Sequence, residues 1–441
     1  MKKIIISLFL ALVVYSSIAQ TPDSSAWTLE KCIEYAKVNN ITIKKQKLNT
    51  LRNQNNYEQS KLNILPNFNA YTGYKYGFGR YFDEVSNEYV DRGQRLYGGI
   101  NSETTLFQGF VKLNNIKEES QNYLASQQLV KETENNISLL IASYYLQILF
   151  DKELLTVAKE QYELTKQQVD RTQKLVDVGS SAMGSLLEIK AQLSREALNI
   201  TNQENNLNIS LLNLEQLLDI EADSEFDIVT PILPEIALIE NDNSSNLFNQ
   251  AQTIMPQIKR SQYELEASKY QLKKIKGYQF PELSFGAGWD TQASKIGSAP
   301  FDLKNNIGDN AYTTLDLTLS IPIFNGHQVK TSIKNAQLGI LDAQYNLQTE
   351  KLTLRKEIEQ ANADALAAQK KYASGKEAVT SYEESFSYSQ KRFEVGLISS
   401  LEYNTAKNDY TKAQSDLLQA KYEYVLRCKI LDFYKGIPIT L

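Results

Sequence analysis

Residues Phe110–Val178 read FVKLNNIKEESQNYLASQQLVKETENNISLLIASYYLQILFDKELLTVAKEQYELTKQQVDRTQKLVDV. The stretch contains neither proline nor glycine. As one α-helix of about 69 residues it would be roughly 100 Å long, because the helix rises 1.5 Å per residue. Gly179 follows directly, and glycine is common just past a helix end.

The apolar residues of this stretch follow alternating three- and four-residue steps, which make the seven-residue repeat of a coiled-coil seam. The ladder runs through Leu113, Ile116, Tyr123, Val130, Ile137, Ile141, Tyr144, Ile148, Leu155, Ala158, Tyr162, Val169 and Val176. Polar rungs interrupt it at Ser120, Gln127, Glu134, Asp151, Thr165 and Thr172. The sequence therefore predicts a very long coiled-coil helix with a partly polar seam.

A second copy of this plan indicates an internal duplication. Residues 328–395 are about as long, contain no proline and end in Val395-Gly396. Landmarks of the first half recur in the same order at offsets of 215 or 217 residues: Ala36 as Ala251, Ile43-Lys44 as Ile258-Lys259, Pro66 as Pro281, Phe107-Gln108-Gly109 as Phe324-Asn325-Gly326, and Val178-Gly179 as Val395-Gly396. We expect a signal peptide at 1–19 and two structural repeats of one plan at 20–230 and 231–441.

The signal peptide is predicted from the charged residues Lys2 and Lys3, the apolar run 4–14, and a cleavage site at Ser17-Ile18-Ala19. No other stretch is apolar for 18 residues, so we expect an exported chain that is either soluble or a β-barrel. The formal charge of −5 gives no basic surface for nucleic acid. We find no catalytic set, phosphate-binding loop, cofactor motif or metal-type spacing of Cys32 and Cys428, so we expect neither an enzyme nor a cofactor or metal site.

Four segments change from the helical period to a period of two. The predicted strands span 67–79, 95–107, 282–290 and 312–321, with loops at 80–94 and 291–310. In each strand one face is apolar and the other polar or small, which is typical of a membrane strand with lipid outside and water inside. The alternation alone fits equally a soluble antiparallel sheet packed on a core. In the membrane interpretation the polar residues Asn69, Lys75, Asn101 and Glu103 face a lumen, and the aromatic residues Tyr74, Tyr76, Phe78 and Trp289 lie in an interface belt.

The flanking helices favour the membrane interpretation, since nothing else in the chain could cover the apolar faces. We expect helices at 29–62, 185–219, 246–276 and 401–434, and a linker at 220–245 with a short strand at 226–229. Two such helices end to end match one long helix, so the linker should lie at mid-length. Four strands cannot close a barrel, and open edges are not tolerated in lipid. We therefore expect two or more chains to share one barrel.

The second predicted turn reads Arg392-Phe393-Glu394-Val395-Gly396-Leu397-Ile398-Ser399-Ser400-Leu401-Glu402. It resembles the hairpin tip of the TolC-like outer-membrane channel family. Together with the signal, the duplication, the strand pairs and the helix lengths, the resemblance covers essentially the whole mature chain. It implies a homotrimer whose twelve-stranded β-barrel, four strands per chain, sits in outer-membrane lipid and continues as a long α-helical tunnel in the periplasm.

The resemblance also implies a passive exit duct in tripartite efflux of small molecules or in type I secretion of proteins. A periplasmic adaptor (membrane fusion) protein and an inner-membrane transporter of the RND or ABC class would dock at the tip, and the transporter would drive transport. The implied adaptor contacts are Val178, Gly179, Arg392, Val395, Gly396, Leu397 and Ser399. The implied pore constriction contains Glu402; Thr405 stands where the family usually has a second acid. The alternative is a periplasmic or surface coiled-coil scaffold that conducts nothing.

Overall fold

The computed structural model describes residues 27–83, 87–221, 226–232, 244–296 and 307–441. The predicted signal peptide lies outside these residues. Each half of the chain contains one helix of 67 residues, α3 (Val111–Asp177) and α8 (Gln328–Glu394), which confirms the two long helices predicted from the coiled-coil repeat. The shorter helices are α1 (Leu29–Asn39), α2 (Ile41–Leu62), α4 (Met183–Leu218), α5 (Ser244–Ile254), α6 (Pro256–Gly277) and α9 (Ser400–Tyr434).

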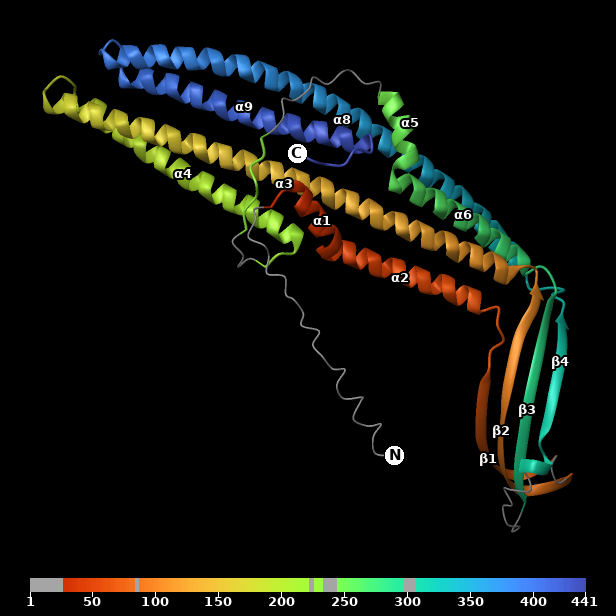
Figure 1. Cartoon of the computed structure of the whole chain (residues 1–441). Helices are drawn as coiled ribbons and strands as arrows, with labels where there is room; N and C mark the ends of the chain where they lie inside the picture. Colours follow the sequence, from red (N-terminus) through yellow and green to blue (C-terminus); the bar gives the residue numbers. More distant parts are fainter. Residues whose placement is uncertain (1–26, 84–86, 222–225, 233–243, 297–306) are drawn as a thin grey trace, which may run out of the picture.

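The helices lie side by side in one elongated body (Figure 1). Helices α3 and α8 run its full length. Near the strands α6 packs between them, and nearer the opposite end α9 packs against both. In the described part of the chain, no helix is both long and apolar enough to span a membrane.

Two predicted single helices are each broken in two, and the breaks occupy equivalent places in the two halves. At Asn40 the backbone leaves helical geometry, and the side chain accepts hydrogen bonds from the backbone N–H groups of Thr42 and Ile43. Such a cap competes with continuation of the helix. In the second half Pro256 follows the break at Met255 and begins α6, because proline has no N–H to bond to the preceding turn. The predictions of unbroken helices at 29–62 and 246–276 were wrong.

The strands form one antiparallel sheet in the order β1-β2-β3-β4. Their bounds are β1 (Asn69–Asp83), β2 (Glu88–Gln108), β3 (Glu282–Ile296) and β4 (Tyr312–Ser320). The predicted loop 80–94 was wrong for most of its length, because β1 and β2 continue as a ladder through it, with Phe82 opposite Tyr89. Their rings make an edge contact at 5.3 Å, and cross-strand aromatic pairs stabilise strands. Strand β3 likewise extends into the predicted loop 291–310, as far as Ile296.

The main apolar core lies at mid-length, where α1 and α4 meet α3. Residues 226–232, the described middle of the predicted linker, pass here. Its expected strand at 226–229 amounts to one parallel bridge between Ile228 and Trp27. The Tyr145 hydroxyl lies 3.0 Å from the carbonyl oxygen of Trp27 and 2.7 Å from that of Val229. The start of the first half and the linker are thus fastened to the same point of α3.

Candidate functional site

Two regions at opposite ends of the body contain the residues singled out from the sequence: the tips of the helical hairpins and the polar face of the sheet (Figure 1). The tips are the turns α3–α4 and α8–α9. In both, a glycine follows the helix with φ +76°, Gly179 in one and Gly396 in the other. A Cβ added at either glycine would meet no atom within 4 Å. Glycine is therefore required by the left-handed backbone and not by lack of space.

The tips present apolar side chains to solvent. Val178 is 73% exposed, Val395 70% and Leu397 68%. Arg392 lies over the ring of Tyr388 at 5.7 Å. The structure thus gathers the apolar tip residues predicted from the sequence at one end of the molecule.

Ser399 has a structural role that the sequence analysis did not assign. It is the N-cap of α9, and its hydroxyl accepts a hydrogen bond from the backbone N–H of Glu402 at 3.2 Å. An ion pair of 2.9 Å between Arg171 and Glu394 links the ends of the two long helices. The two hairpin tips are therefore joined as well as adjacent.

Glu402 and Thr405 lie one turn apart on the first two turns of α9, and both are exposed. The Glu402 carboxylate is close to the helix N-terminus, where the helix dipole favours a negative charge. The Thr405 hydroxyl donates to the carbonyl oxygen of Leu401 at 2.9 Å. Among the described residues neither side chain has a charged partner.

A buried lysine near the tips was missed by the sequence analysis. Lys407 is 1% exposed. Its ammonium group lies 2.8 Å from Glu196 Oε1 on α4 and 3.0 Å from the carbonyl oxygen of Gln161 on α3, and it also donates to the Thr165 hydroxyl. Burial lowers the pKa of Lys407, and the carboxylate of Glu196 opposes that shift. One side chain therefore ties α9 to the α3–α4 hairpin.

A sequence signal for Lys407 did exist. Ser400, Tyr403 and Lys407 follow three- and four-residue steps along the buried side of α9. Lysine is almost never fully buried unless it is paired, so a lysine on the buried side of a helix indicates a buried ion pair.

At the other end, the pairing of strands places the predicted lumen residues on one face. Asn69 is paired with Asn101, and Lys75 with Arg95. Glu103 shares that face because it is two residues from Asn101 along β2. All four predicted residues are at least partly exposed to solvent.

Glycines on this polar face leave room for larger neighbours. The ring of Tyr97 covers Gly73, and the Asp316 carboxylate covers Gly286. The Tyr71 hydroxyl donates to Asp290 Oδ1 across two strands. The polar face therefore contains a side-chain hydrogen bond that joins β1 to β3 over β2.

The opposite face of the sheet is apolar and exposed. It presents Phe68, Tyr74, Tyr76, Phe78, Ile100, Phe285, Trp289, Leu315, Leu317 and Leu319. The helices meet the sheet only at its end (Figure 1). No described element of the chain covers this face, which rules out the alternative of a sheet packed on the chain's own core.

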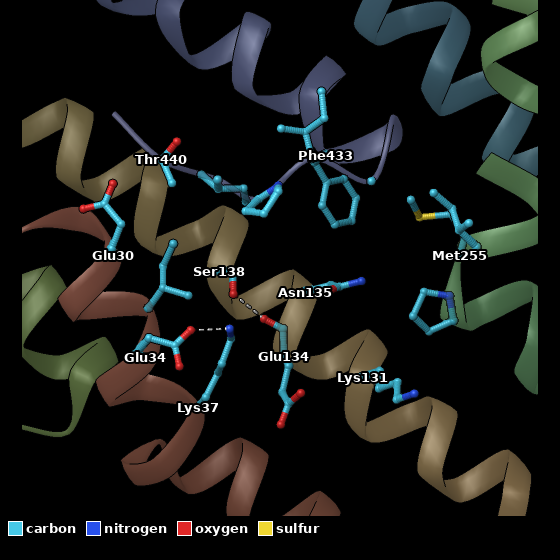
Figure 2. Close-up of a pocket in the computed structure, with 17 residues that line it drawn as sticks. Glu30, Glu34, Lys37, Lys131, Glu134, Asn135, Ser138, Met255, Phe433 and Thr440 are labelled. Atoms are coloured by element: carbon cyan, nitrogen blue, oxygen red, sulfur yellow. Dashed lines mark hydrogen bonds and ion pairs between the residues drawn. The ribbon is translucent and has the colours of Figure 1, made fainter. Parts of the chain in front are cut away.

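A cavity of about 580 Å³ lies at mid-length between α1, α3, the start of α6 and the C-terminal residues (Figure 2). Its wall is mixed, with Glu34, Lys37 and Glu134 on one side and Met255 and Phe433 on the other. Lys37 is paired with Glu34 at 2.6 Å. Among the described residues no group of three or more His, Cys, Asp or Glu side chains is arranged to hold a metal ion.

Comparison with known proteins gave consistent matches. The family described as "Outer membrane efflux protein" matches residues 32–219 and 247–432, one match in each half. Outer membrane protein TolC of Escherichia coli (strain K12) is 22% identical over 451 residues, covering 97% of this chain and 85% of that protein. TolC of Vibrio cholerae is 21% identical, covering 83% and 81%.

Solved structures show the same fold. The chain superposes on the Campylobacter jejuni CmeC outer membrane channel with a TM-score of 0.78 at 18% identity, covering 92% of this chain and 85% of that one. The match to CusC has a TM-score of 0.79 at 18% identity, covering 93% and 92%. The fold class predicted from the sequence is confirmed by these neighbours.

Proposed function

Because this chain belongs to the outer membrane efflux protein family, a family of outer-membrane channels, we propose that it is the passive exit duct of a tripartite export system. In this proposal three copies each donate four strands to one twelve-stranded barrel in the outer membrane. The helices of the three copies form a tunnel through the periplasm.

The observation that carries the proposal is the incomplete sheet. Strands β1 and β4 are its two edges, and in the described residues each pairs with a single neighbouring strand. Unpaired backbone groups in hydrocarbon cost several kcal/mol each, and closed membrane barrels need about eight strands or more. One chain cannot meet this condition, whereas three chains of four strands supply twelve.

The helices provide the length of the duct. Each long helix has 67 residues, which corresponds to roughly 100 Å at 1.5 Å per residue. The strands lie at one end of these helices and the tips at the other (Figure 1). A trimer of this shape would carry material from the tips to the barrel without exposing it to the periplasm.

The exposed apolar tips are the proposed contact for an adaptor protein. Val178, Val395 and Leu397 project from turns that glycine fixes in place, and clustered exposed apolar side chains favour protein contacts. The inner-membrane transporter would supply the energy and this chain the passage. Glu402 in three copies would form a ring of negative charge at the tip end of the tunnel, where a narrow pore concentrates its field.

The duct is tested by electrical recording from purified protein in planar bilayers. We expect discrete conductance steps, and a smaller preference for cations in the Glu402→Gln variant. Glu359→Gln is the matched control, because Glu359 is an exposed carboxylate near the middle of α8 and is paired with Arg355 at 2.8 Å. Folded protein that never conducts would contradict the duct and favour a scaffold.

The adaptor contact is tested by photo-crosslinking in cells. A photoreactive residue at Leu397 should capture a periplasmic adaptor. Leu352, which is also exposed but lies far from the tip on α8, is the control. Leu397 is a better position than Ser399, since the Ser399 hydroxyl caps α9. Equal capture of the adaptor from both positions would contradict docking at the tip.

A further inference from the structure

The charged side chains on the polar face of the sheet are segregated along the strands. The register aligns Glu103, Gly286 and Asp316 in one row across β2, β3 and β4. Gln108, Glu282 and Ser320 form a row nearer the helices. The face therefore has three carboxylates in the part that adjoins the helices.

The surroundings of these three carboxylates are a glycine and neutral donors. The Asp316 carboxylate leans over Gly286, where a Cβ would come within 2.5 Å of it. Gly286 separates Asp316 from Glu103 in the row, so the glycine opens space toward the second carboxylate. Glu282 accepts from Gln108 Nε2 at 2.7 Å and from the Thr105 hydroxyl at 3.2 Å, both neutral donors.

One cation lies near this acidic group. Lys112 at the start of α3 donates to the backbone carbonyl oxygen of Thr105, at 3.5 Å. Within the described residues Glu103, Glu282 and Asp316 form no ion pair. The acidic group therefore keeps a net negative charge.

The other part of the polar face carries basic side chains among the described residues. Lys75 and Arg95 are direct partners in the β1–β2 ladder, and Arg95 is also opposite Ser294 on β3. Two basic side chains therefore lie side by side on adjacent strands at this level of the sheet.

An aromatic zone that contains one carboxylate, Asp290, separates the two groups. Tyr71, Gly99, Asp290 and Tyr312 form one row, and Tyr97 lies opposite Gly73 in the next. Asp290 accepts the hydrogen bond from the Tyr71 hydroxyl. From Glu103 to Arg95 along β2 is eight residues, or about 27 Å at 3.4 Å per residue. That separation exceeds the Debye length of about 10 Å in 0.1 M salt, so each group sets its own local potential.

We propose that the barrel lumen is bipolar, with an acidic zone (Glu103, Glu282 and Asp316) at the tunnel end and a basic zone (Lys75 and Arg95) at the outer end. The inference rests on the proposed function, because it takes the polar face as the lumen of a closed barrel. Three copies place nine carboxylates in the first zone and six cations in the second. Permeating cations concentrate at the tunnel end and anions at the outer end, and a solute carrying both charges is oriented as it leaves.

Two serines on β3 allow a matched test. Ser284 lies between the two acidic rows, while Ser294 is the partner of Arg95, and both are on the polar face of the same strand. The Ser284→Cys and Ser294→Cys variants are embedded in lipid vesicles and treated with cationic and anionic methanethiosulfonate reagents. The unsubstituted protein, with its native Cys32 and Cys428, gives the background.

We expect the ratio of cationic to anionic reaction rates to be higher for Ser284→Cys than for Ser294→Cys, by about sevenfold for each kT of potential difference between the zones. The difference should disappear in 1 M salt, where the Debye length is about 3 Å. Adding Glu103→Gln and Asp316→Asn to the Ser284→Cys variant should lower its ratio toward that of Ser294→Cys.

The outcomes separate the two claims. Equal ratios at the two positions in low salt would overturn the bipolar lumen while leaving the duct intact. If charged reagents reach neither cysteine, the polar face does not line a water-filled lumen, and the proposed barrel itself is wrong.

Discussion

Replacing Lys407 by methionine should loosen the contact between α9 and the α3–α4 hairpin. The substitution removes the ammonium group but leaves the Glu196 carboxylate, which is 8% exposed. Removing one partner of a buried ion pair costs about 3–5 kcal/mol, because the remaining charge is uncompensated. Since 1.4 kcal/mol is a factor of ten, local opening should become roughly 100- to 4,000-fold more frequent.

Hydrogen exchange followed by mass spectrometry measures this opening directly. Peptides covering 190–200 of α4 and 400–413 of α9 should lose protection in Lys407→Met. Lys371→Met is the control, because the ion pair between Lys371 and Glu423 at 3.2 Å is largely exposed, and such pairs contribute about 0.2–1 kcal/mol.

A double variant tests the physical reason. In Glu196→Leu with Lys407→Met, both charges are gone, and well-packed apolar replacements of buried ion pairs are often neutral. Protection should therefore recover most of the way to that of the unsubstituted protein. Unchanged protection in Lys407→Met, or a double variant as unprotected as the single one, would refute the reasoning.

Three further outcomes follow from the structure. Gly396→Ala should destabilise the tip by about 1 kcal/mol, because alanine resists a positive φ. Gly184→Ala, at a position without positive φ, should not destabilise it. Equal hydrogen-exchange protection of the tip in the two variants would contradict this. Burial raises the pKa of Asp151, so ionisation of this carboxyl costs stability as pH rises through that pKa. The thermal midpoint of Asp151→Asn should therefore increase relative to that of the unsubstituted protein between pH 4 and pH 7. A relative increase on acidification instead would contradict this. Burial raises the pKa of Cys32 to about 12, so this thiol should resist iodoacetamide at pH 8 until the protein is unfolded. Unreduced, unfolded protein should then take up two alkyl groups; none would reveal a disulfide with Cys428.

The long helices and the faces of the strands could be predicted because both follow from local periodicity. The seven-residue ladder locates α3, and a glycine with positive φ ends each hairpin arm, at Gly179 and Gly396. Alternation along β1 and β2 was enough to place Asn69 and Asn101 on one face, and the observed register pairs them directly.

The missed features depend on contacts that the local pattern does not contain. The helix breaks at Asn40, whose side-chain amide also donates to the carbonyl oxygen of Leu217 at 2.8 Å. Leu217 is far from Asn40 in the sequence, so local periodicity does not reveal this contact. Strands β1 and β2 extend beyond the segment with alternating apolar residues, because Phe82 and Tyr89 pair across the hairpin. Lys407 is buried because its partner Glu196 is 211 residues away in the sequence.

The central claim is that one copy of this chain cannot close its own barrel. Native mass spectrometry of the detergent-purified protein tests it most directly. We predict a single species close to three times the mass of one chain, stable until the sheet unfolds. A folded, monodisperse single chain of about 50 kDa would contradict the account.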